Sequence, residues 1–225
     1  MPEQVRVNIN EHQSVTANIY KAAARDRAGI TLILGHGAGS GQMSPFMVSF
    51  SNELASRGID TVTFNFFYSE HGRGAPDRND ALEACYRAAI ATVRKHAKLK
   101  LNKLAIGGKS MGGRIASQVA ASGEVEDIAG LVFLGYPLHP PGNTEKLRSA
   151  HLPNVKSSML FVQGSRDNFG SPDELRPIVK TLRGRATLYV VEGGDHSLKV
   201  SRNAEKQAEV YKIVQDEIAN WLKQL

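Results

Sequence analysis

The chain has 225 residues, of which 41% are hydrophobic and 22% are charged, a balance typical of a soluble globular protein. This length is enough for one α/β domain with a large core. The single cysteine, Cys85, excludes an internal disulfide, and no Cys/His cluster has the spacing of a zinc site. The N-terminus lacks the apolar run of a signal peptide, and no apolar stretch is long enough to span a bilayer. We therefore expect a cytoplasmic protein without a membrane partner.

The formal net charge of +6 raises the question of nucleic-acid binding. The densest basic run, residues 94–103, lies at the expected end of a helix, where cations complement the helix dipole. Lysines and arginines are otherwise spread over many segments, and no basic stripe is interleaved with aromatic residues. We therefore predict no nucleic-acid partner. The sequence leaves the oligomeric state open.

Short apolar runs alternate with amphipathic segments along the chain, which predicts alternating strands and helices. We expect an N-terminal hairpin and six further strands at residues 5–9, 15–20, 30–34, 60–66, 103–106, 128–134, 159–163 and 187–191. We expect helices at residues 45–57, 77–97, 110–121, 172–182 and 199–225, the last of them interrupted once near its start. This order predicts one α/β domain over residues 1–225, with a mostly parallel sheet covered by helices on both faces.

The most informative motif is Gly-x-Ser-x-Gly at residues 108–112, between an apolar strand and a helix of small residues. A serine at such a strand-to-helix turn has a strained backbone and an exposed hydroxyl. The flanking glycines allow neighbouring backbone to approach closely, and the N–H groups at the start of the helix favour a developing negative charge. The motif therefore predicts that Ser110 is a nucleophile.

A serine nucleophile needs a base and a carboxylate that orients the base. Functional residues of parallel sheets collect at the carboxyl ends of the strands. Asp167 and His196 each follow a predicted strand, in the loops after residues 163 and 191. We therefore predict a triad of Ser110, His196 and Asp167. The neighbouring Asp195 is better explained as a residue that shapes the histidine loop.

Acyl transfer also needs two N–H donors for the oxyanion. We assign the first to Met111 and the second to Ala38 in the glycine-rich loop 35–41, with Gly39 as the alternative. His36 in this loop resembles a base but is better explained as a residue that holds the loop. The possible substrate-pocket residues are His36, Gly39, Tyr68, Arg73 and His139.

Two of these pocket residues have competing explanations. Arg73 could receive a substrate carboxylate or pair with Glu70 inside its own loop. His139 lies in the proline-rich loop 136–153 and could reach the site or be an ordinary loop histidine. No insertion is long enough for a separate cap domain, so we expect an open site that is covered only by loop 136–153.

The motif, the His-Gly loop and the order Ser, Asp, His resemble the α/β-hydrolase superfamily over nearly the whole chain. Longer strings resemble one small branch, which includes a testis-expressed hydrolase-like protein, a regulatory subunit of the nonspecific-lethal chromatin complex and dienelactone-hydrolase-like bacterial proteins. These strings are residues 35–39, 64–66 with Tyr68, Glu70, Gly72, Arg73, Pro76 and Asp77, then 107–114, 135–142, 163–167 and 193–197. Phe67 and Gly74 depart from the branch's usual pattern, so the resemblance supports the triad more than a shared pocket.

These features predict a serine hydrolase that is either carboxylesterase-like or an acyl hydrolase. We expect it to act on a small ester through an acyl-enzyme and to need no metal or cofactor. The rival hypothesis is a non-catalytic interaction or regulatory module that keeps the fold. Its signature would be the loss of a triad residue, and none is lost. A nucleotide-binding protein is disfavoured because Ser40 interrupts the Gly-x-Gly-x-x-Gly pattern that Gly35 and Gly37 begin.

Overall fold

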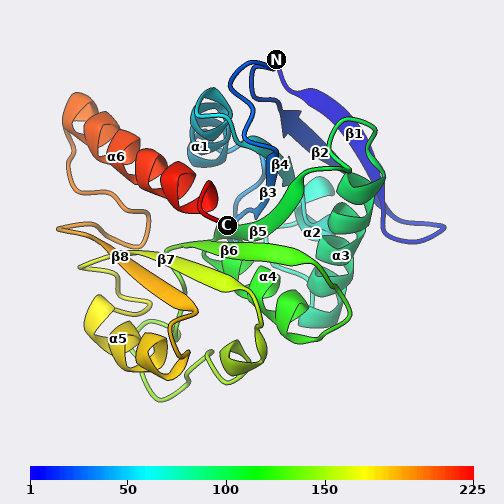
Figure 1. Ribbon diagram of the computed structural model, residues 1–225. Coiled ribbons are helices and arrows are strands. Elements are labelled where there is room, and N and C mark those ends of the chain that lie inside the picture. The colour runs from blue at the N-terminus through cyan, green and yellow to red at the C-terminus, as the bar shows by residue number, and fades with distance from the viewer.

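The computed structural model describes all residues, 1–225, and contains one eight-stranded sheet (Figure 1). The strands are β1 (Glu3–Asn8), β2 (Ser14–Tyr20), β3 (Ile30–Gly35), β4 (Asp60–Phe64), β5 (Lys103–Lys109), β6 (Ile128–Leu134), β7 (Ser158–Gly164) and β8 (Ala186–Val191). Their order is β1-β2-β4-β3-β5-β6-β7-β8. Only the β1–β2 and β2–β4 pairs are antiparallel, so the sheet is mostly parallel, as the sequence predicts.

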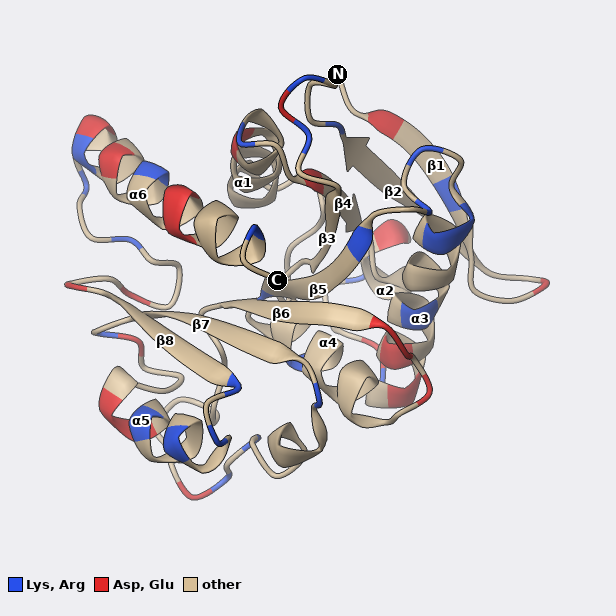
Figure 2. Cartoon of the chain, viewed as in Figure 1, with Lys and Arg blue, Asp and Glu red and all other residues tan.

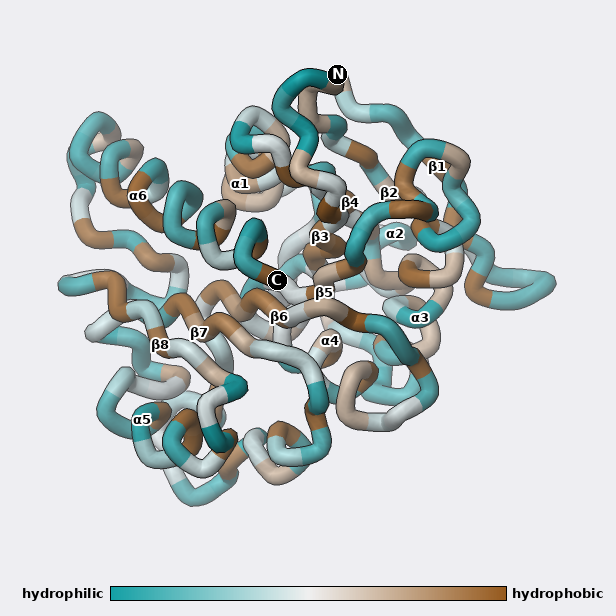
Figure 3. The backbone as a smooth tube through the Cα atoms, viewed as in Figure 1, coloured by the Kyte–Doolittle hydropathy of each residue, from teal (hydrophilic) through white to brown (hydrophobic).

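Helices cover both faces of this sheet. They are α1 (Pro45–Ser56), α2 (Phe67–Glu70), α3 (Asn79–Lys95), α4 (Met111–Ala121), α5 (Pro172–Thr181) and α6 (Ala204–Leu222), with a short 3₁₀ helix at Leu152–Asn154. α1 and α6 pack on one face, and α3, α4 and α5 pack on the other (Figure 1). The apolar strands run through the middle of the molecule, between these two layers (Figure 3). There is no separate cap domain.

The parallel strands bring the ends of β3, β5, β7 and β8 to one edge of the sheet. Gly35 at the end of β3 is paired with Gly108 of β5, and Gly164 at the end of β7 is paired with Val191 of β8. The loops that follow these strands carry the serine, aspartate and histidine motifs. The register therefore places the three motifs at the same edge, as expected for a parallel sheet.

The C-terminal helix differs from its prediction, because it begins at Ala204 and is not interrupted. The side chain of Asn203 accepts a hydrogen bond from the Lys206 N–H and caps the helix. The preceding residues are held in an irregular loop, in which the buried side chain of Gln207 accepts hydrogen bonds from the Val200 and Ser201 N–H groups. These side-chain bonds replace the helical turn that residues 199–203 were expected to form.

Charged residues are distributed over many elements. Lysines and acidic residues are interspersed along α6, and basic residues also lie on α3, on α5 and in several loops (Figure 2). No helix has both the length and the apolar character that crossing a membrane requires.

Candidate active site

The turn between β5 and α4 is compact and strained. Ser110 has φ 50° and ψ −116°, a conformation that non-glycine residues rarely adopt. Its N–H donates to the Leu134 carbonyl, and a Cβ at Gly112 would collide with the carbonyl oxygen of Gly35. Glycine at this position therefore lets β3 and the start of α4 approach closely. The packing holds the Ser110 hydroxyl at the first turn of the helix.

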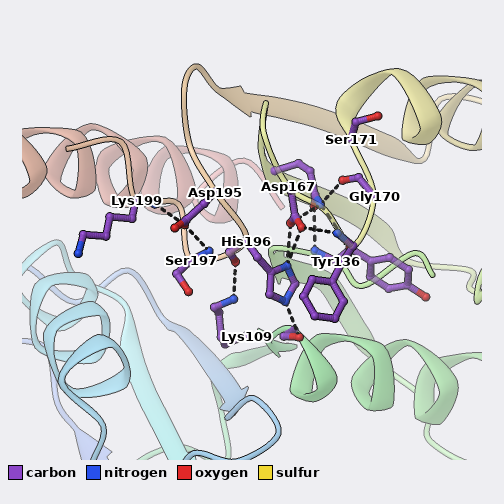
Figure 4. Close-up of polar contacts among 12 residues, drawn as sticks. Lys109, Tyr136, Asp167, Gly170, Ser171, Asp195, His196, Ser197 and Lys199 are labelled. Carbon is purple, nitrogen blue, oxygen red and sulfur yellow. Dashed lines mark hydrogen bonds and ion pairs between the residues drawn. The ribbon is translucent and has the colours of Figure 1, made fainter. Parts of the chain in front are cut away.

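The three predicted triad residues form one chain of hydrogen bonds (Figure 4). His196 Nε2 lies 2.7 Å from Ser110 Oγ, and His196 Nδ1 lies 2.8 Å from Asp167 Oδ2 and 2.9 Å from Oδ1. A carboxylate facing Nδ1 favours the tautomer with its proton there, which leaves Nε2 free to accept the serine proton. The structure thus brings a serine hydroxyl, an imidazole and a carboxylate together in the order that acyl transfer needs.

Asp167 is 3% exposed, and both of its oxygens have further partners. Oδ1 accepts the Phe169 N–H at 2.8 Å, and Oδ2 accepts from Gln163 Nε2 at 2.7 Å. Hydrogen bonds of this kind fix the plane of the carboxylate. Gln163 is therefore a positioning residue for the carboxylate that faces His196.

The histidine loop is fixed on two sides. The Phe169 ring stacks on the His196 ring, with a centroid distance of 4.1 Å and an interplanar angle of 26°. On the other side, Asp195 Oδ1 accepts the Ser197 and Lys199 N–H groups, the loop-shaping role expected for this residue. Gly135, with φ 68°, leaves space for the His196 carbonyl that a side chain would fill.

The glycine-rich loop after β3 lies beside Ser110. Ala38 lines the same cavity as Ser110, and its N–H donates no hydrogen bond within the chain. Met111 is the first residue of α4, so its N–H has no partner earlier in the helix. These are the two N–H groups assigned to an oxyanion from the sequence. Gly39 does not line the cavity.

His36 holds this loop from inside the protein. It is fully buried, its Nε2 accepts the Phe66 N–H at 3.1 Å, and its Nδ1 lies 2.8 Å from the Gly37 carbonyl, to which it donates. Burial lowers the pKa of the imidazole, so the ring is neutral. This arrangement matches the structural explanation of His36 and leaves it no contact with the cavity.

The cavity beside Ser110 has a volume of about 440 Å³. Its walls come from the loop after β3, the first turn of α1, the end of β5, the loop after β7, the histidine loop and α6. The lining residues are Gly37, Ala38, Ser40, Ser44, Pro45, Phe46, Met47, Lys109, Ser110, Phe169, His196, Ser197 and Tyr211. Aromatic rings and hydroxyls dominate this lining, and it contains no carboxylate.

The comparisons with known proteins agree with this architecture. A family profile described as an alpha/beta hydrolase domain matches residues 28–223. The protein belongs to the α/β-hydrolase family. The hydrolase fold of this chain is accordingly shared with many solved structures.

Three of these structures illustrate the likeness. A serine hydrolase without a lid from Xanthomonas campestris is 17% identical, with a TM-score of 0.74 over 98% of this chain and 94% of that chain. Dienelactone hydrolase from Anabaena variabilis is 19% identical, with a TM-score of 0.73 over 96% and 95%. An esterase domain from a Rhodothermus marinus protein is 14% identical, with a TM-score of 0.74 over 100% and 98%. At such identities the likeness shows the fold alone.

The remaining pocket residues expected from the sequence do not line the cavity of this α/β-hydrolase. Tyr68 is buried in α2, with its hydroxyl directed at the Gly37 carbonyl. Arg73 pairs with Asp77 at 2.7 Å, in place of the Glu70 that one of its two explanations named. Strand β4 ends at Phe64, and the short helix α2 follows it almost at once.

His139 and its loop also lie away from the cavity. The His139 ring is buried and pairs with Glu174 of α5 at 3.1 Å, while the His139 backbone N–H donates to the Phe169 carbonyl. No residue of loop 136–153 lines the cavity, so the expectation that this loop covers the site is wrong. The walls come instead from Phe46, Phe169 and Tyr211.

Sequence reasoning missed these three aromatic residues as parts of the site. Phe169 lies two residues after Asp167, so its place in the aspartate loop was a usable signal. Phe46 opens α1 after the glycine-rich loop, a weaker signal. Tyr211 lies in the middle of α6 and carries no local motif. No group of three or more His, Cys, Asp or Glu side chains is gathered in a way that could hold a metal ion.

Proposed function

We propose that the protein is a serine hydrolase that cleaves small carboxylic esters through an acyl-enzyme. The observation that carries this proposal is the continuous hydrogen-bonded chain from Asp167 through His196 to Ser110, which ends at the wall of a cavity. The names of two structural neighbours, a dienelactone hydrolase and an esterase domain, are consistent with ester chemistry. The family membership supports the broader class of hydrolase.

In the proposed mechanism, Ser110 Oγ attacks the ester carbonyl while His196 Nε2 takes the hydroxyl proton. Asp167 keeps the imidazole in the correct tautomer and stabilises the imidazolium that forms. The N–H groups of Met111 and Ala38 donate to the oxyanion of the tetrahedral intermediate. His196 then gives its proton to the leaving alcohol, and a water molecule that it activates in the same way hydrolyses the acyl-enzyme.

The size of the cavity limits the substrate. A volume of about 440 Å³ is in the lower part of the range for small-molecule sites, about 300–1,000 Å³. No cap domain extends it into a tunnel. The proposed substrates are therefore esters with short or medium acyl groups.

The decisive experiment is labelling with a fluorophosphonate, which reacts with activated serines, followed by peptide mapping. We expect the label on Ser110 alone, and none on the Ser110→Ala variant. We also expect Ser110→Ala to reduce kcat on a simple ester by about three orders of magnitude or more. The matched control is Ser122→Ala, which removes a hydroxyl from the other end of α4 and should label like the wild type.

Labelling that persists in Ser110→Ala would contradict the assignment of the nucleophile. A wild-type protein that neither labels nor cleaves any ester of a broad panel would favour the non-catalytic module. The sequence-based expectations of a cytoplasmic location, of no nucleic-acid partner and of membership in the branch with the chromatin-complex subunit stay predictions.

A further inference from the structure

The proposed mechanism leaves one charged side chain of the cavity without a role. Lys109 is the last residue of β5 and directly precedes the nucleophile. It is the only Lys, Arg, Asp or Glu among the residues that line the cavity. Its ammonium donates a hydrogen bond to the His196 carbonyl (Figure 4) and lies 5.9 Å from the centroid of the Phe46 ring. Lys109 thus stands between the nucleophile turn, the histidine loop and the first turn of α1.

This ammonium has donor capacity to spare, since it carries three N–H bonds and only one is used by the His196 carbonyl. It makes no salt bridge within the chain, because the two nearest carboxylates are engaged elsewhere. Asp167 is bound by His196 and buried hydrogen-bond donors, and Asp195 accepts two N–H groups of its own loop. Lys109 is therefore a positive charge beside the cavity with which no carboxylate of the chain forms an ion pair.

The first turn of α1 adds to the positive potential on the same wall. Ser44, at the N-cap, makes no side-chain capping bond, and the first turn contains no acidic residue. Ser44, Pro45, Phe46 and Met47 all line the cavity, so the positive end of this helix faces it. A helix end of this kind strengthens the attraction of an anion that Lys109 binds directly.

We propose that Lys109 determines specificity by binding a carboxylate of the substrate, so that the enzyme prefers esters that carry a carboxylate near the scissile carbonyl over neutral esters of the same shape. This inference rests on the proposed ester hydrolysis. The bound carboxylate takes the two free N–H bonds of the ammonium, while the third stays on the His196 carbonyl. Lys109 therefore links recognition of the anion to the loop that carries the base.

Two pairs of substrates test the inference from both sides of the ester bond. For the acyl side, the p-nitrophenyl half-ester of adipic acid is compared with p-nitrophenyl 6-methylheptanoate. In this neutral ester an isopropyl group stands in place of the free carboxylate. For the alcohol side, the butyryl ester of p-hydroxybenzoate is compared with that of p-hydroxybenzamide. The quantity of interest is the ratio of kcat/KM for the anionic ester to that for its neutral partner.

We expect the wild type to prefer the anionic member of at least one pair. Lys109→Met should reduce this ratio by about tenfold or more, since a hydrogen bond to a charged group contributes about 1.5–3 kcal/mol. Lys109→Arg should keep part of the preference. Because Lys109→Met also removes a bond to the His196 carbonyl, both rates are expected to fall, and the ratio cancels that common loss.

The matched control is Lys103→Met, which removes the same charge from the opposite end of β5. It should leave the ratio close to that of the wild type. A similar fall in both variants would mean that the overall positive charge, and not Lys109, attracts the anion, and would overturn the inference.

The pH dependence of the ratio supplies an independent test. Burial lowers the pKa of the Lys109 ammonium to about 8, although the Asp167 and Asp195 carboxylates act in the opposite direction. The other titratable groups around it are His196 and Tyr211, and burial raises the pKa of Tyr211. Lys109 is charged below about pH 8 and loses its proton above, so the anionic preference should decrease in that direction in the wild type. In Lys109→Met the ratio should not change over this interval.

The outcomes separate the two proposals. If neutral esters are cleaved but the ratio is the same in the wild type and in Lys109→Met, ester hydrolysis stands and the carboxylate site is wrong. If no ester is cleaved faster than by Ser110→Ala, the proposed function fails. The site is then judged by titrating adipate into Ser110→Ala and into the double variant with Lys109→Met by calorimetry. Binding that the second substitution does not weaken would refute the site.

Discussion

Gln163, at the end of β7, donates a hydrogen bond to the Asp167 carboxylate. We predict that replacing Gln163 will lower both the stability and the activity of the protein. Its side chain is fully buried and makes four hydrogen bonds. Oε1 accepts the Tyr136 N–H at 2.8 Å, and Nε2 donates to Asp167 Oδ2 and the Gly170 carbonyl, each at 2.7 Å, with a longer contact of 3.3 Å to the Tyr136 carbonyl. This one side chain ties the loops after β6 and β7 to the carboxylate.

Gln163→Leu keeps the approximate volume but removes every one of these bonds. The Tyr136 N–H and the Gly170 carbonyl have no other hydrogen-bond partner, so both become buried and unsatisfied. With the lost bond to Asp167, and about 1–3 kcal/mol for each unsatisfied buried group, we expect a loss of about 3–6 kcal/mol in the free energy of unfolding. This is a large fraction of the about 5–15 kcal/mol that typically stabilises a folded protein.

The same substitution should also slow catalysis. Asp167 keeps His196 and the Phe169 N–H as partners but loses one hydrogen bond to its charged form. A bond of this kind contributes about 1.5–3 kcal/mol, which corresponds to a fall of about ten- to one-hundredfold in kcat/KM if the carboxylate turns away from the imidazole.

Denaturant unfolding and ester hydrolysis at fixed pH measure the two effects. Gln207→Leu is the matched control, because Gln207 is also buried, makes three hydrogen bonds to the loop before α6 and does not contact Asp167. It should lower stability by a comparable amount and kcat/KM much less. An unfolding free energy within about 1 kcal/mol of wild type, together with unchanged kcat/KM, would refute the reasoning for Gln163.

Three further predictions concern the elbow, acid stability and the cavity. Gly112→Ala should lower kcat/KM by about one-hundredfold or more, because its Cβ collides with the Gly35 carbonyl and displaces the nucleophile by a fraction of an ångström or more; unchanged kinetics would contradict the close approach. Burial, with the charge of Arg114, lowers the pKa of His151 to about 4, and the folded protein holds the ring in its neutral form, bonded to Ser117. Because the unfolded chain takes up this proton first, the free energy of unfolding should fall by up to about 3 kcal/mol as the pH falls from about 6.5 to 4. His151→Gln should flatten this slope in unfolding measurements, and an identical slope would exclude His151 as its source. Finally, kcat/KM over a series of p-nitrophenyl esters should peak at short or medium acyl chains, and a steady rise to long chains would refute the limit set by the cavity.

The fold and the central hydrogen-bonded chain could be predicted because their signals are local. Apolar runs separated by helical segments define a parallel sheet, and the sheet brings the loops after its strands to one edge. Ser110, Asp167 and His196 each follow a strand directly, so their meeting required no knowledge of side-chain packing. The Met111 and Ala38 N–H groups could be assigned from the sequence for the same reason, because both residues lie in turns or loops that directly follow these strands.

The pocket could not be predicted in the same way, because its walls depend on contacts between distant segments. Tyr68 and Arg73 also follow a strand, yet α2 buries the first and Asp77 pairs with the second. Two half-buried side chains stabilise this path, since Asn65 Nδ2 donates to Glu70, and the Glu70 carboxylate also accepts from a threonine of β2. A local rule that strand ends line the site therefore fails where a short helix follows the strand at once.

The position of loop 136–153 has a consequence for substrate selection. Contacts with α5 and the aspartate loop hold this loop in place: His139 pairs with Glu174 of α5, and the His139 backbone N–H donates to the Phe169 carbonyl. Within the loop, the Arg148 N–H donates to the Leu138 carbonyl, and the Arg148 carbonyl accepts from the Tyr136 hydroxyl. A cavity that neither a cap domain nor loop 136–153 covers encloses only part of a substrate. A charge without an ion-pair partner in such a cavity can discriminate between anionic and neutral esters more strongly than a hydrophobic pocket discriminates between acyl chains that differ by one methylene. In a site without such a cover, we therefore expect kcat/KM to depend more on the charge of the substrate than on the length of its acyl chain.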